Sequence, residues 1–351
     1  MRGLAVDRNG KLSVPELAMP SYNDNQALVK TLSCGVCNGT DGKLIHGTFK
    51  NMTEYPMLLG HEGVGRVIEV GKNVTKYKKG DIVLLPFLYE AQDGYAQGWG
   101  SYAEYAVVGD EGAFARAGKG IGTPEYDEGC WAQTIIHAED KVDAVGAAMI
   151  ITFREVLSAM KRFGFAANES ILIFGAGPVG LCFTRFAKLL GMGPVVTVDV
   201  HDDKTKEAAR MGADVVINSQ KQDVNEEIKR MFPNGVDNVV DAVGINALIN
   251  QAMKLVKYNG KICGYGISAK LDMQLDWSEG PYNWTLQFVQ FPSKYEEYQV
   301  HRQIMAWINA GLLNPMDFIS DVVPFDRILD AFELMEKRLG TTKKIVISYE
   351  E

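Results

Sequence analysis

The sequence predicts an α/β protein of two domains, one β-rich and one built on a doubly wound parallel sheet. Up to about residue 150, short apolar runs are separated by glycine and proline, which is typical of a β-rich domain. After Gly146, strands alternate with helices, and this rhythm predicts a parallel sheet with helices on both faces. A chain of 351 residues is long enough for two such cores.

The β-rich part is expected to be barrel-like, because its apolar runs are short and end at turn residues. Strands are predicted at residues 27–33, 63–70, 81–85 and 102–108. Towards the C-terminus we expect a helix at 295–310, a strand at 322–323, a helix at 327–337 and a strand at 344–348.

The parallel sheet is predicted from five later apolar runs. They lie at residues 171–174, 195–199, 215–217, 239–241 and 261–264. The helix after the first run is expected to begin near Pro178, since proline suits a first turn, and to end at Gly191.

Charge and composition argue against several classes of partner. The net charge is −8, and no cluster of Lys and Arg with interleaved aromatic residues could neutralise a phosphate backbone, so nucleic acid is not expected. No window approaches about eighteen apolar residues and the N-terminus lacks a secretion signal, so we expect a cytoplasmic protein without a membrane partner. Five cysteines are a sparse, odd-numbered set, which argues against a disulfide framework.

A glycine-rich turn follows the first strand of the predicted parallel sheet. Gly175, Gly177 and Gly180 are followed, at the end of the next strand, by Asp199. Such a turn lets backbone amides approach a pyrophosphate at a helix N-terminus, and the distal acid accepts from ribose hydroxyls. The pattern therefore predicts a dinucleotide site, and the alternative is a glycine-rich turn with a capping aspartate.

A second pattern combines Gly60-His61-Glu62 with an upstream cysteine, Cys37. An imidazole and a thiolate that can converge on one ion suggest an open catalytic zinc site. The alternatives are that Cys34 and Cys37 form a redox pair or are simply buried thiols, and that His61 is an ordinary turn histidine.

Together these features resemble the zinc-containing medium-chain dehydrogenase/reductase family of alcohol, polyol and sugar dehydrogenases. The run from Gly60 to Val74 fits that family's zinc signature at every fixed position, and the resemblance extends over nearly the whole chain. It implies a Rossmann doubly wound parallel sheet domain plus a β-rich GroES-like catalytic domain. The expected boundaries are 152–291 for the NAD-binding domain, and 1–151 with 292–351 for the catalytic domain.

The resemblance also implies the metal ligands. Cys37 and His61 are expected to bind the zinc ion, Glu62 to be a ligand or a close neighbour, and Asp41 to orient His61. One catalytic zinc ion per chain is expected and no structural zinc, because residues 87–110 contain no cysteine.

The sequence departs from the family pattern at two places. Ile151 stands where relatives have a third ligand, so either the metal has only the three ligands above plus water, or Glu155 one helical turn later substitutes. One extra residue precedes Thr40, the expected proton relay. Lys43 or His46 could pass the proton outward, and a solvated loop is the alternative.

The implied cofactor is NAD, because the Asp199 carboxylate would repel the 2′-phosphate of NADP. The residues expected at the cofactor are Gly175, Gly177, Pro178, Val179, Gly180, Asp199, Val243, Gly264 and Gly266. The segments 90–99 and 118–137 are expected to line the substrate cleft. The aromatic candidates for its walls are Tyr89, Trp99, Trp131, Tyr282 and Trp284, with ordinary core packing as the alternative.

The activity that the resemblance implies is a zinc- and NAD-dependent oxidoreductase. It would interconvert a secondary alcohol of a polyol, sugar or related polar metabolite and the ketone. The alternatives are a zinc-free reductase of the same fold and a catalytically inactive NAD-binding protein, the latter motivated by Ile151. A homodimer or homotetramer is expected.

Overall fold

The structure is a computed structural model that describes residues 1–123, 129–337 and 340–350. The chain divides into two compact units, Met1–Arg154 with Ser293–Glu351, and Glu155–Pro292. Each unit has its own buried hydrophobic core. Part of the predicted cleft-lining stretch, residues 124–128, lies outside the described residues.

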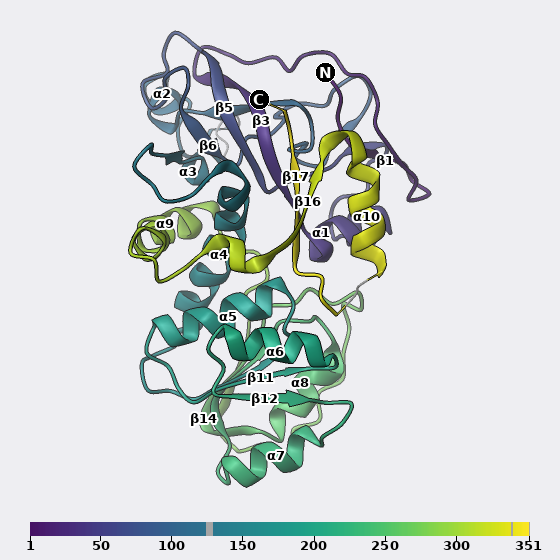
Figure 1. Ribbon diagram of the computed structural model, residues 1–351, viewed down its shortest axis with the longest axis vertical. Coiled ribbons are helices and arrows are strands. Elements are labelled where there is room, and N and C mark those ends of the chain that lie inside the picture. The colour runs from purple at the N-terminus through teal and green to yellow at the C-terminus, as the bar shows by residue number, and fades with distance from the viewer. Residues whose placement is uncertain (124–128, 338–339, 351) are drawn as a thin grey trace. The chain divides into compact units, whose positions relative to one another are not determined.

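The first unit is β-rich, as predicted, and its described residues form two sheets. Its strands are β1 (Ala5–Val6), β2 (Leu12–Ser13), β3 (Gln26–Val36), β4 (Met57–Leu58), β5 (Gly63–Val70), β6 (Ile82–Leu84), β7 (Ala96–Gln97), β8 (Tyr105–Gly109), β9 (Ile135–Ile136), β16 (Ile319–Pro324) and β17 (Lys344–Ser348). The larger sheet has the order β16-β17-β3-β5-β6-β9 with β8 also pairing β3, and the smaller has the order β2-β1-β4-β7. Figure 1 shows the C-terminal β17 in yellow beside the purple β3, with which it pairs antiparallel.

The first unit also contains helices. They are α1 (Asn38–Ile45), α2 (Glu111–Arg116), α3 (Gly129–Ala132), α9 (Lys294–Asn309) and α10 (Ile328–Lys337), with 3₁₀ turns η1 (Pro315–Phe318) and η2 (Phe325–Arg327). The helix α4 (Ala144–Phe163) begins in this part of the chain and continues into the next unit. The helices predicted at 295–310 and 327–337 are confirmed, whereas α1 was not predicted.

The second unit is built on one parallel sheet. Its strands are β10 (Ile171–Phe174), β11 (Val195–Asp199), β12 (Val215–Asn218), β13 (Val236–Asp241), β14 (Val256–Gly264) and β15 (Trp284–Phe288), and its helices are α5 (Pro178–Leu189), α6 (Asp202–Arg210), α7 (Val224–Met231) and α8 (Asn246–Met253). The order is β12-β11-β10-β13-β14-β15, and every pair is parallel. The predicted doubly wound parallel sheet is therefore confirmed.

The strand order of this sheet locates a binding edge. The chain moves outward from β10 to β12 and then returns to the other side of β10 at β13. In open α/β sheets, ligands bind at the carboxyl ends of the strands where the order reverses in this way. The glycine-rich turn follows β10, so it lies at that point.

Among the described residues, no helix is long and apolar enough to cross a membrane.

Candidate functional site

The pairing of β3 with β5 brings the candidate metal ligands together. Cys37 directly follows β3 and caps the N-terminus of α1, whereas His61 and Glu62 directly precede β5. The two strands are antiparallel, and Cys34 near the end of β3 lies opposite Gly63 at the start of β5. Residues far apart in the sequence therefore meet at one end of this strand pair.

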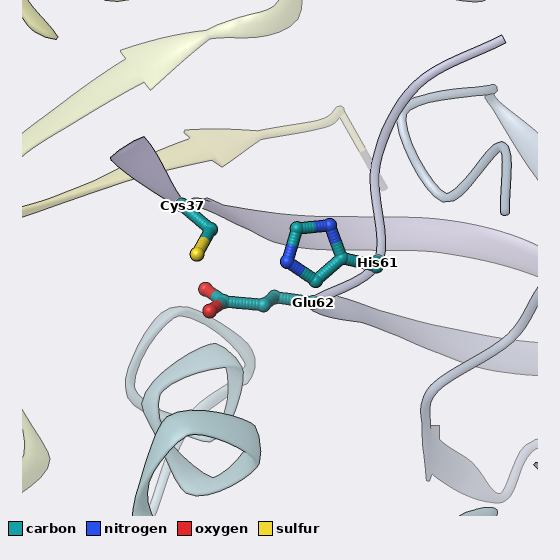
Figure 2. Close-up of side chains that lie close together, drawn as sticks. All are labelled: Cys37, His61 and Glu62. Atoms are coloured by element: carbon teal, nitrogen blue, oxygen red, sulfur yellow. The ribbon is translucent and has the colours of Figure 1, made fainter. Parts of the chain in front are cut away.

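The three side chains converge on a common point. Donor atoms of Cys37, His61 and Glu62 all lie within 4.8 Å of one another, and no other group of three such side chains occurs in the described part of the chain. Figure 2 shows the sulfur, one ring nitrogen of His61 and the Glu62 carboxylate facing one another. Thiolate, imidazole and carboxylate are the ligand types of catalytic zinc, so the residues fit this metal.

Asp41 lies beside the imidazole, as predicted. Its Oδ1 is 3.6 Å from Nδ1 of His61, and neither of these buried atoms has a hydrogen-bond partner. Its Oδ2 accepts hydrogen bonds from the Cys37 backbone N–H at 2.9 Å and from the Tyr102 hydroxyl at 2.7 Å. A small rotation of the ring would complete the bond from Nδ1, which fixes the tautomer whose other nitrogen is available for a metal.

Lys344 is a site residue that sequence reasoning missed. Its Nζ lies 2.8 Å and 2.7 Å from the two carboxylate oxygens of Glu62, and both side chains are almost completely buried. Thr152 donates a further hydrogen bond of 3.0 Å to Glu62. Burial raises the pKa of Glu62, but Lys344 and His61 outweigh that effect and the pKa lies below its usual value. Glu62 is therefore ionised and already paired.

The missing third ligand has no replacement in this group. Ile151 is fully buried and packs in an apolar cluster with Leu85, Phe87 and Ala132. Among the described residues, the metal-ligating group does not include Glu155. The substitution by Glu155 therefore gains no support from the structure, and the ligand set of Cys37, His61 and Glu62 stays a prediction.

The expected proton relay lies on α1 rather than in a loop. Thr40 is buried, with 6% of its surface exposed, and Asp41 follows it in the same helix. Lys43 donates from Nζ to the Gly39 carbonyl at 2.9 Å, and His46 is an exposed residue that caps the C-terminus of the helix. The segment forms a helix and not a loop, but His46 is solvent-exposed as the alternative expected, and the proton-relay roles of Thr40, Lys43 and His46 stay predictions.

The redox-pair alternative for Cys34 and Cys37 gains no support from the structure. Neither cysteine forms a disulfide, and Cys34 is fully buried in the hydrophobic core of the first unit. Burial raises the pKa of the Cys34 thiol well above its usual value, which disfavours a reactive thiolate there.

The three glycine positions in the glycine-rich turn differ in their structural surroundings. Gly175 has φ +98°, a conformation that favours glycine. A Cβ on Gly180 would lie 1.8 Å from the Gly175 carbonyl oxygen, so α5 packs too closely on the turn for any side chain. Gly177 has an ordinary φ of −71°, and a Cβ there would meet no atom within 4 Å. No protein atom therefore excludes a side chain at this N-cap position, and the open space fits a pyrophosphate beside the start of α5, where Pro178 and Val179 form the first turn.

Asp199 is held against this turn. It ends β11, its Oδ2 accepts from the Ala176 backbone N–H at 2.8 Å, and its Oδ1 accepts from the His201 N–H at 3.0 Å. Burial lowers the pKa of nearby Lys204, and Asp199 opposes that shift. The carboxylate is thus fixed at the edge of the dinucleotide turn with a cation close by.

The remaining predicted cofactor residues lie at the same edge of the sheet. Asp241 ends β13, pairs across to Gly264 at the end of β14, and accepts from the Val243 N–H at 2.9 Å. A Cβ on Gly266 would lie 2.1 Å from the Gly244 nitrogen, so these two loops are in close contact. The sheet therefore brings Val243, Gly264 and Gly266 to the carboxyl ends of the strands; their contacts with a cofactor stay predictions.

The aromatic candidates are scattered. The ring of Trp99 lies 5.3 Å from that of His61, so this side chain borders the metal group. Trp131 contacts Tyr295 at 5.3 Å, and the Tyr89 hydroxyl donates to Gln133 at 3.0 Å. Tyr282 and Trp284 belong to the second unit, where Tyr282 is 99% exposed.

Comparison with known proteins identifies the family. Residues 178–287 match the zinc-binding dehydrogenase domain, and residues 23–144 match the alcohol dehydrogenase GroES-like domain. An alcohol dehydrogenase from Geobacillus stearothermophilus is 32% identical over 261 residues, which cover 73% of this chain and 74% of that protein. A D-arabitol-phosphate dehydrogenase from Enterococcus avium is 28% identical over 314 residues, which cover 82% of this chain and 85% of the relative.

The fold agrees with these matches. The solved structure of an alcohol dehydrogenase from Thermus sp. ATN1 is similar to this chain with a TM-score of 0.80 at 21% identity, and the similarity covers 100% of both chains. The two matching domains, the relatives and the common fold lead to one conclusion: the chain belongs to the zinc-containing medium-chain alcohol and polyol dehydrogenase family.

Proposed function

We propose that the protein is a zinc- and NAD-dependent oxidoreductase that interconverts a secondary alcohol of a polyol, sugar or related polar metabolite and the ketone. The observation that carries this proposal is the convergence of Cys37, His61 and Glu62 within 4.8 Å. The open glycine turn at Gly177 supports the nicotinamide cofactor. We also propose one zinc ion per chain, a cytoplasmic location for a protein whose five cysteines form no disulfide, and a homodimer or homotetramer.

Oxidation of a secondary alcohol removes a hydride from carbon and a proton from oxygen. A zinc ion bound at this site supplies Lewis-acid stabilisation of the negative charge that develops on the alcohol oxygen. Cys37 and His61 would hold that ion, and Asp41 would orient the imidazole ring of His61 through Nδ1. The hydride would pass to NAD. The Thr40 hydroxyl would accept the alcohol proton while giving up its own, and His46, exposed at the end of the same helix, would release a proton to solvent.

The proposal is tested by metal analysis of purified protein together with an NADH-absorbance screen of sugar alcohols and sugars. Stoichiometric zinc and turnover that a chelator abolishes are expected. Turnover without bound metal would instead favour the zinc-free reductase, and NAD binding without turnover across a broad panel would favour the inactive NAD-binding protein.

We expect polyols or sugars to be better substrates than short aliphatic alcohols. The relative from Enterococcus avium is named for a sugar-alcohol phosphate, and a site built for several hydroxyls leaves buried polar groups unpaired when a simple alcohol binds. The kcat/KM of the best polyol or sugar should therefore exceed that of ethanol or 2-propanol by on the order of a hundredfold. A panel led by short aliphatic alcohols would contradict the polar substrate but leave the dehydrogenase assignment intact.

We expect NAD to be preferred over NADP. Asp199 is fixed at the turn by two backbone N–H groups, so its charge cannot move away from a 2′-phosphate. Lys204 lies close enough to reduce that repulsion, so the preference should be on the order of tenfold rather than absolute. The measurement is kcat/KM with each cofactor for the wild type and Asp199→Ser, and the variant should lose most of the preference.

A further inference from the structure

We infer that Lys344 is a positioning residue that keeps Glu62 from becoming a permanent ligand of the zinc ion. The inference deepens the proposed function and rests on it. It concerns a residue at the opposite end of the chain, since Lys344 begins the C-terminal strand β17 and Glu62 directly precedes β5. The ammonium group competes with the metal for the same carboxylate.

The carboxylate of Glu62 lies in a built site. Lys344 donates to both of its oxygens, at 2.8 Å and 2.7 Å, and Thr152 donates to Oε1 at 3.0 Å. A Cβ on Gly35 would lie 2.2 Å from Oε2, so the backbone of β3 leaves room for the carboxylate at this point. The side chains of Glu62 and Lys344 are 1% and 3% exposed.

The hydrogen bonds leave Glu62 little capacity for a metal. An ionised carboxylate accepts about four hydrogen bonds, two at each oxygen. Oε1 already accepts from Lys344 and Thr152, and Oε2 accepts from Lys344. The capacity that remains is at Oε2. Figure 2 shows the carboxylate beside the sulfur of Cys37, and its donor atom lies within 4.8 Å of those of Cys37 and His61. Glu62 is therefore close enough to bind the ion but is held by a competing cation.

The charge balance gives this arrangement a chemical purpose. A Cys37 thiolate and a Glu62 carboxylate would together offset the whole charge of a divalent ion, which weakens it as a Lewis acid. The ammonium group of Lys344 offsets one of those negative charges. The centre then keeps a positive charge for the developing charge on the substrate oxygen, and its open position is not filled by Glu62.

A purely structural role for Lys344 predicts a different result. If the ion pair only stabilises the packing of β17 within the unit, its loss should make the positions of the metal ligands less fixed and weaken metal binding. If Lys344 competes with the metal, its loss should free Glu62 as a ligand and strengthen metal binding. The two interpretations thus predict opposite changes in zinc affinity when Lys344 is replaced.

The test compares Lys344→Met with the wild type and with Lys344→Arg, which keeps the charge. The matched control is Lys76→Met, because Lys76 also forms a partly buried pair, 2.7 Å from Glu111. Zinc retention is measured by competition with a chelator, the ligand field by absorption of the cobalt-substituted protein, and the fold by thermal unfolding. Lys344→Met should retain zinc about tenfold or more tightly, the scale on which groups around the ligands change metal affinity.

Further readouts should accompany that change. Lys344→Met should alter the ligand-field bands of cobalt, keep the charge-transfer band of the Cys37 thiolate and lower kcat more than it changes KM. Lys344→Arg should resemble the wild type, and Lys76→Met should lower only the unfolding temperature. If Lys344→Met fails to fold, Thr152→Val provides the test. It removes one hydrogen bond to Glu62 at nearly constant side-chain volume and should also increase zinc retention.

Two failures can be told apart. Equal or weaker zinc retention in Lys344→Met, or in Thr152→Val where the first variant does not fold, would overturn the positioning role. A wild-type protein that binds no stoichiometric zinc would overturn the proposed function itself.

Discussion

Replacing Cys37 or His61 with alanine is expected to lower kcat/KM by about a thousandfold or more. The reason is the size of the effect that a zinc ion has on acidity: it lowers the pKa of bound water from far above the physiological range to about 7. The glycine-rich turn belongs to the second compact unit, so both variants should still bind NADH. Steady-state kinetics measure kcat/KM, metal analysis measures bound zinc, and fluorescence titration measures the affinity for NADH.

Cys34→Ala is the matched control for Cys37→Ala. Cys34 lies three residues earlier in the chain but is fully buried in the core, so its loss should lower the unfolding temperature without removing the metal. Under the redox-pair alternative, the two cysteine variants would lose activity together. Full activity of Cys37→Ala or His61→Ala, with no bound metal, would contradict the zinc mechanism.

Much of the candidate metal site could be predicted because its residues are close to strand ends. Cys37 follows an apolar run that forms β3, and His61 and Glu62 precede a run that forms β5. An antiparallel pair brings the end of one strand to the start of the other, so two short motifs were enough. The alternating strands and helices of the second unit were also predictable from local sequence, because the periodicity of their apolar residues lies within each element.

Lys344 could not be predicted in the same way. The run Lys344–Ser348 predicts a strand, and a lysine at the start of a strand is usually solvated. Its role depends on pairing between β17 and β3, which joins residues almost at opposite ends of the chain. Nothing local in the sequence records which strand it will lie beside or that a buried carboxylate will face it.

The helix α1 was missed because its own sequence opposes helix formation. Gly39 and Gly42 each disfavour a helix by about 1 kcal/mol relative to alanine, and the segment has only eight residues. Tertiary packing compensates, because Leu44 and Ile45 are buried in the core of the first unit. The helix matters for function, since it determines where Thr40 and Asp41 lie.

Gly177→Ala is expected to weaken NADH binding by roughly a hundredfold or more without lowering the unfolding temperature. Its φ of −71° suits alanine, and the new methyl group would meet no protein atom within 4 Å. The methyl would instead occupy the space of the pyrophosphate and disrupt about two hydrogen bonds to a charged group, each of about 1.5–3 kcal/mol. NADH fluorescence titration and thermal unfolding measure the two effects separately.

Gly180→Ala is the contrasting variant, in the first turn of the helix that Gly177 caps. Its methyl would lie 1.8 Å from the Gly175 carbonyl oxygen, so α5 must move and the unfolding temperature should fall. Loss of binding in Gly180→Ala therefore follows from damage to the turn, whereas loss of binding in Gly177→Ala follows from the ligand alone. Normal NADH affinity in Gly177→Ala would mean that the pyrophosphate does not lie against this turn, and the cofactor assignment of Gly175, Gly177 and Gly180 would then be wrong.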